Sequence, residues 1–290
     1  MPDLLFVLFE ISVLTLFAVC LRQAARFGPA VVWQLLAGVL FGLLLEWTTL
    51  RQLQSYQYGR FLLMLGDLPL LIGVGWGVIL YSVRVFADAT SLPEWARPVL
   101  EGLLALNIDL GMDAIAVRLG MWSWGLGLQA QYFGVPYANF WAWFWVALTF
   151  SVGLRAFARP VTWTGRWLGP MAAVGFGLVN LAAMNALLAM GVPAASYLPT
   201  IGLMLGVAVG LVIWLRPRFS HLPVDPVTFW VPFGFHTFFL TAGLLTGAVL
   251  QPPALLFIGL LMAGVALYLH RRSLWAFHKR ATASSRGGPP

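Results

Sequence analysis

The chain is poor in charged residues and almost devoid of cysteine. Only 9% of its 290 residues are Asp, Glu, Lys or Arg, against roughly a quarter in a soluble domain. Because 60% of the residues are hydrophobic, we expect an integral membrane protein. The single cysteine, Cys20, excludes a disulfide framework and a cysteine-based metal site. No basic residue precedes the first apolar run, as one would in a signal peptide, so we interpret that run as a retained span.

Long apolar segments occupy most of the chain. A helix needs about 20 apolar residues to cross a bilayer. We expect an all-α fold, a polytopic transmembrane helical bundle of about eight or nine spans, with residues 1–280 as one membrane domain. Residues 281–290 have little to bury and are predicted to be a disordered tail. The predicted spans are roughly 4–21, 30–47, 62–83, 98–117, 138–154, 168–190, 197–215, 228–249 and 254–270.

The basic residues gather at one set of segment ends. With nine spans, Arg51, Arg60 and Arg118 fall on one side, and every other Lys and Arg falls on the other. Basic residues accumulate on the cytoplasmic side of membrane proteins. We therefore expect a cell-membrane protein with its N-terminus outside and its C-terminus in the cytoplasm. The net charge of +7 then reflects membrane anchoring and indicates no nucleic-acid partner.

Two carboxylates interrupt the fourth predicted span. Asp109 and Asp113 are four residues apart, so they lie on the same face of a helix. Ionisable residues inside a bilayer are costly and tend to face a cavity or a partner. Two carboxylates in contact do not both ionise cheaply, so one is expected to hold a proton beside a charged neighbour. Such a pair suits proton donation, or an inert polar network inside the bundle.

Aromatic and amide side chains surround this pair in the sequence. Membrane proteins carry aromatic belts at the interface, but these rings can also line an apolar ligand or face a transient cation. His236 joins the same site if the eighth span packs against the fourth, and otherwise forms a structural hydrogen bond. The spacing of the remaining histidines does not make a metal site. The candidate substrate-binding residues are Asn107, Trp122, Trp124, Tyr132, Asn139, Trp143 and His236.

Two sequence blocks resemble a family of integral-membrane carotenoid biosynthesis proteins. They are 109–124, similar to the family's Asp-x-x-x-Asp-Pro and Trp-x-Trp stretch, and 132–144, similar to its aromatic–Gly-Val-Pro–Asn-Phe block. A looser block runs from Glu46 through Tyr56-x-Tyr58-Gly59 and Leu68-Pro69 to Trp76, ahead of Tyr81. Ala114 stands where a proline is usual, and Ala142 where a glycine is usual.

The resemblance implies a carotenoid hydratase. The characterised members of that family add water across the terminal C-1′,2′ double bond of an acyclic ψ end group. The substrate is then a carotenoid of the lycopene or γ-carotene type, or a C50 precursor. This is acid catalysis through a tertiary cation and requires no cofactor. We expect Asp113 and Asp109 to supply the proton donor and its charge partner, and Glu46 to position or deprotonate water. The expected partners are the carotenoid, the lipid bilayer and other carotenoid biosynthesis enzymes.

Two other functions fit parts of the sequence. Asn107-x-Asp109-x-x-x-Asp113 is similar to the acidic helix of magnesium-dependent membrane prenyltransferases, which bind the metal through oxygen ligands. That chemistry needs a second acidic cluster, and Asp225 stands alone in the later sequence. A proton-coupled transporter also places carboxylates inside the bilayer. Transporters often contain inverted repeats, and we find none here.

Overall fold

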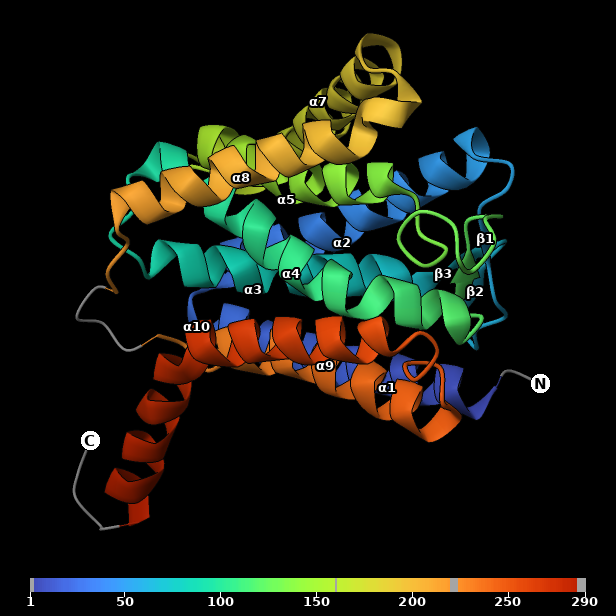
Figure 1. The fold of residues 1–290 in the computed structure, drawn as a ribbon. Coiled ribbons are helices and arrows are strands. Elements are labelled where there is room, and N and C mark those ends of the chain that lie inside the picture. Colours follow the sequence, from blue (N-terminus) through green and yellow to red (C-terminus); the bar gives the residue numbers. More distant parts are fainter. Residues whose placement is uncertain (1–2, 160, 220–223, 286–290) are drawn as a thin grey trace.

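Long helices make up the chain (Figure 1). The computed structural model describes residues 3–159, 161–219 and 224–285, with side chains described as far as Arg271. Within this part, nine helices have 19 or more residues. They are α1 (Leu4–Arg26), α2 (Pro29–Gln52), α3 (Leu70–Asp88), α4 (Arg97–Arg118), α5 (Tyr137–Phe157), α7 (Gly169–Gly191), α8 (Tyr197–Leu215), α9 (Val227–Thr246) and α10 (Pro253–Ser285).

The predicted fold class is confirmed. Eight of these helices, all except α4, are long and apolar enough to cross a membrane. The remaining long helix, α4, begins at Arg97 and ends at Arg118, and it carries Glu101, Asp109 and Asp113 between them. Most residues of α4 are buried and none is exposed, because it packs against α3, α5, α9 and α10. The protein is therefore a multi-pass membrane bundle whose most polar helix lies inside it.

The helices form layers (Figure 1). α3 and α4 lie in the middle, with α1, α9 and α10 on one side and α2, α5, α7 and α8 on the other. The short helix α6 (Trp163–Trp167) and the 3-10 turns η1 (Glu94–Ala96) and η2 (Ala194–Ser196) join longer elements. The middle position of α4 surrounds its carboxylates with protein and keeps them away from lipid.

Four short strands close one end of the bundle. β1 (Gln57–Tyr58) pairs antiparallel with β4 (Trp122–Ser123), so that Tyr58 lies opposite Trp122. β2 (Met64–Leu65) pairs with β3 (Leu68–Pro69) in a tight hairpin. The third span therefore begins at Leu70, and the prediction that it begins near residue 62 is wrong. Buried Glu10 accepts the backbone N–H groups of this loop at Leu62 (3.1 Å) and Leu63 (3.0 Å).

Ion pairs gather at the opposite end of the bundle. Asp88 accepts Arg155 at 2.7 Å and Arg97 at 3.3 Å and lies 3.6 Å from Arg84, and Arg155 also pairs with buried Glu101. This is the end to which the positive-inside pattern assigns the cytoplasm. The orientation itself stays a prediction. The predicted disordered tail also stays untested, since residues 281–285 continue α10 and residues 286–290 lie outside the described residues.

Glycines allow α2 and α3 to approach closely, as small residues do between membrane helices. A Cβ atom added at Gly42 would lie 2.4 Å from Cβ of Trp76, and one added at Gly77 would lie 2.9 Å from the backbone nitrogen of Val39. Gly42 is one turn before Glu46 on α2. The contact therefore holds Glu46 beside Trp76.

We predict that Gly42→Ala destabilises the protein. The added methyl group must push α2 and α3 apart, and overpacking of this kind costs about 1–3 kcal/mol. The midpoint of thermal unfolding in detergent should fall. Gly206→Ala in α8 is the control, because nothing lies within 4 Å of a Cβ added there. Equal midpoints for the two variants would contradict the close packing.

Candidate active site

A cavity of about 690 Å³ lies between α2, α3, α4, α5 and α7, near the end closed by β1 and β4. Its lining is mostly apolar and aromatic. Asp113, Glu46 and Asn139 are polar groups that line it from three different helices. Ligand sites commonly combine an apolar lining with a few placed polar groups. The cavity therefore has the composition of a site for an apolar substrate that undergoes a polar reaction.

The two aspartates of α4 share one amide donor. The side-chain nitrogen of Asn139 donates to Oδ2 of Asp113 at 2.7 Å and to both oxygens of Asp109 at 3.2 and 3.3 Å. Asp109 is 0% exposed and Asp113 is 2% exposed. The two carboxyl groups also lie within hydrogen-bonding reach of each other. A hydrogen bond between two carboxyl groups requires a proton on one of them.

Local structure brings these donors to the pair. Gly134 has a φ of 98°, which a glycine adopts without strain, and Pro136 is the N-cap from which α5 begins. The turn at 134–136 thus places Asn139 in the first turn of α5. Trp122 in β4 donates its indole N–H to Oδ1 of Asp113. Both oxygens of Asp113 therefore accept a hydrogen bond.

Glu46 ends a second polar chain, which borders the same cavity. Its Oε1 accepts the indole N–H of Trp76 at 2.7 Å, and its Oε2 accepts the hydroxyl of Tyr58 at 2.7 Å. Tyr56 in turn donates to the Tyr58 hydroxyl at 2.7 Å. Burial, together with the nearby Glu46 carboxyl, raises the pKa of Tyr58 well above its usual range. The Tyr58 hydroxyl therefore keeps its proton and stays a donor to Glu46.

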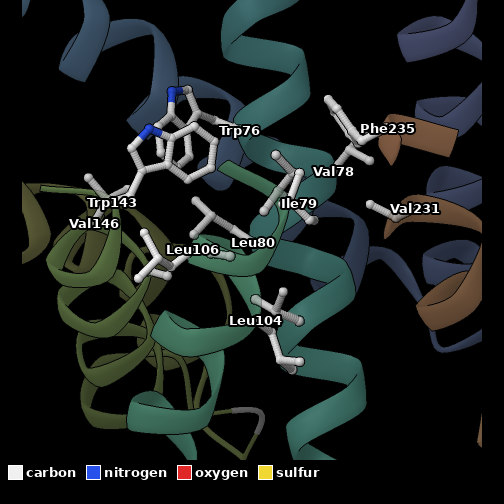
Figure 2. Close-up of a cluster of buried hydrophobic side chains, with 14 of the residues drawn as sticks. Trp76, Val78, Ile79, Leu80, Leu104, Leu106, Trp143, Val146, Val231 and Phe235 are labelled. Atoms are coloured by element: carbon white, nitrogen blue, oxygen red, sulfur yellow. The ribbon is translucent and has the colours of Figure 1, made fainter. Parts of the chain in front are cut away.

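Aromatic rings form much of the remaining wall. Trp76 of α3 and Trp143 of α5 lie against each other with ring centroids 4.1 Å apart (Figure 2). Tyr56 stacks on Trp124 at 4.2 Å. All four rings line the cavity. The faces of such rings attract cations, so the wall suits a substrate that becomes positively charged for a short time.

The structure brings most of the predicted site residues together. The cavity-lining ones among them are Glu46, Asp113, Trp122, Trp124, Asn139 and Trp143. Asp109 lies behind Asp113 and reaches the site through Asn139. α4 continues unbroken through Ala114, where the family's usual proline would make a kink.

Besides Asp109, three predicted residues do not line the cavity. The Tyr132 hydroxyl donates to the carbonyl of Leu110 at 2.8 Å. Asn107 and His236 hydrogen-bond to each other at 3.2 Å where α4 meets α9, and Asn107 also donates to the carbonyl of Met262 in α10. The expected contact between the eighth span and the fourth exists, but on another face of α4. Asn107 and Asp109 are two positions apart, which is about 200° around a helix.

The sequence predicts no role for several other residues that line the cavity. Tyr56, Tyr58 and Trp76 belong to the loosest of the three resembling blocks, and their spacing alone indicates no chemistry. The part of α7 that lines the cavity, which includes Asn185 and Ala186, has no clear sequence signal, because apolar residues occupy almost all of this helix.

The prenyltransferase alternative finds less support in the geometry of the described residues. Among the described residues, no three His, Cys, Asp or Glu side chains gather into a metal-binding group. Asp225 precedes α9 at the end of the bundle opposite β1 and β4, where it accepts the backbone N–H of Val227 at 3.0 Å. It therefore does not face Asp109 and Asp113 as a second acidic cluster would.

Comparison with known proteins identifies the family. Residues 3–215 match the family of carotenoid biosynthesis proteins, and this match covers well over half of the chain. The protein belongs to that family, so it has a role in carotenoid biosynthesis. All cavity-lining residues except Phe235 fall within the matched range. No curated protein and no solved structure matches the chain.

We predict that Asn139→Leu destabilises the protein strongly. It removes the shared donor and leaves two buried carboxyl groups short of hydrogen bonds, which costs about 2 kcal/mol or more. Thermal unfolding in detergent measures the loss. The control is Asn180→Leu in α7, where the amide donates only to a carbonyl of its own helix. If both variants unfold at the same temperature, the aspartates do not depend on Asn139.

Proposed function

We propose that this protein is a carotenoid hydratase of the hydro-lyase class. It would add water across the terminal C-1′,2′ double bond of an acyclic ψ end group, in a carotenoid of the lycopene or γ-carotene type or in a C50 precursor. The observation that carries the proposal is the position of Asp113. This carboxyl group is backed by Asp109 and lies on an aromatic cavity that Glu46 also lines.

The reaction begins with a proton transfer to carbon. The less substituted carbon of the double bond takes the proton, and the more substituted carbon becomes a tertiary cation. Asp113 is the proton donor in this proposal, because it lines the cavity and Asp109 does not. Asp109 is the charged partner of the pair. Once the proton has left, both carboxylates are negative and face the positive charge on carbon, while Asn139 and Trp122 donate hydrogen bonds to them. General acids placed in this way contribute about 10²–10⁴-fold to a rate.

Water completes the reaction. Its oxygen bonds to the cationic carbon, and one of its protons leaves, so that the sum of the two steps is the gain of one water. Glu46 is the proposed acceptor of that proton, since both of its oxygens are held in place by Trp76 and Tyr58. The exposed side chains of Gln52, Ser55 and Gln131 line the loop end of the cavity and give water a polar route inward.

Between protonation and the addition of water, the cavity wall protects the cation. Trp76 and Trp143 offer ring faces, which stabilise positive charge without accepting a proton. Preorganised groups of this kind are effective because they need no rearrangement as charge develops. No step requires a cofactor.

We predict that Asp113→Asn lowers hydration by at least 100-fold, because the amide cannot donate an acidic proton. Asp109→Asn should also lower it, by removing the carboxyl group that shares the proton. The measurement is mass analysis, in a lycopene-producing bacterial host, for carotenoid that has gained one water. Asp67→Asn, in the exposed loop between β2 and β3, is the control at matched protein level. Full hydration by both site variants would refute the assignment.

A further inference from the structure

The first half of α7 packs closely against α5 and α2, whereas its second half keeps its contact with α5 but has many exposed residues. A Cβ added at Gly153 of α5 would lie 3.0 Å from Cα of Ala173, and one added at Gly177 would lie 2.9 Å from the ring of Phe41 in α2. At Gly191, the far end of α7, nothing lies within 4 Å. Figure 1 shows α7 and α8 rising away from the bundle toward this end.

The second half of α7 borders the cavity. Its contribution to the lining includes Ala182, Asn185, Ala186 and Ala189, all of which are exposed. Across from them, α2 contributes Leu45 and Thr49. On its other side α7 stays attached to α5, because the indole N–H of Trp141 donates to the carbonyl of Met184 at 3.1 Å. The separation therefore faces α2.

We propose that the cavity opens sideways into the bilayer between α2 and the 182–189 segment of α7, and that a linear carotenoid enters there end first. The identity of this ligand rests on the proposed function. A long polyene dissolves in lipid and not in water, so its end group must leave the bilayer through the side of the bundle. This lateral opening leads from the exposed side of α7 to Asp113 within one continuous cavity. Water has the separate polar route past Gln52 and Gln131.

A labelling experiment tests the lateral opening without using catalysis. Cys20, the only cysteine in the sequence, is fully buried, so an added cysteine is the reactive one. We expect lycopene in proteoliposomes to slow the reaction of Ala186→Cys with a membrane-soluble maleimide at least threefold. Leu187→Cys is the control, since Leu187 is exposed on the same turn and does not line the cavity. Equal slowing at both positions, or none at either, would overturn the lateral opening.

A product measurement adds an independent test. Ala186→Trp should lower hydrated carotenoid at least tenfold in the lycopene-producing host, by filling the opening, while Leu187→Trp should leave it unchanged at matched protein level. Full hydration by Ala186→Trp would overturn the proposed route. If the unaltered protein forms no hydrated product but lycopene still protects Ala186→Cys, the hydratase proposal fails and the lateral opening stands.

Discussion

The hydrogen bonds from one amide, Asn139, to two buried carboxyl groups are the constraint on which the rest of the site depends. A carboxylate without partners is too costly to bury, and two adjacent ones are costlier still. Here Asn139 donates to both groups and Trp122 donates to Asp113. In the proposed mechanism, the contacts that satisfy the pair also hold one acidic proton beside the cavity. Stability and chemistry therefore rest on the same few atoms.

Much of the scaffold serves to bring these atoms together. α4 carries the aspartates and lies in the middle of the bundle. The other eight long helices are more apolar than α4, and together they shield it from lipid. The pairing of β1 with β4 aligns Tyr58 with Trp122, and thereby brings the Glu46 network and the Asp113 network to the same end. Pro136 starts α5 where Asn139 can reach α4. Membership of the carotenoid biosynthesis family agrees with a site that joins an acid pair to a largely apolar cavity.

The sequence predicts the helices well and the site in part. Apolar length identifies the spans, and the four-residue spacing of Asp109 and Asp113 identifies their common face. The third span is misplaced because the apolar residues on both sides of Gly66 look like a continuation, although Gly66, at a φ of 64°, turns the chain into a hairpin. Asn107 and His236 meet on another face of α4. The sequence does not predict this, because a helix that is buried on all sides has no hydrophobic periodicity to show which neighbour each face contacts. The same lack of signal conceals the part of α7 in the cavity.

Infrared spectroscopy of the protein in lipid tests the central claim most directly, because the carbonyl stretch of a protonated carboxyl group differs from the bands of a carboxylate. The account predicts that the unaltered protein at neutral pH has such a band, that the band shifts in deuterated water, and that it is lost in the double variant Asp109→Asn, Asp113→Asn. A band that is absent in the unaltered protein, or unchanged in the double variant, would contradict a proton held by this pair.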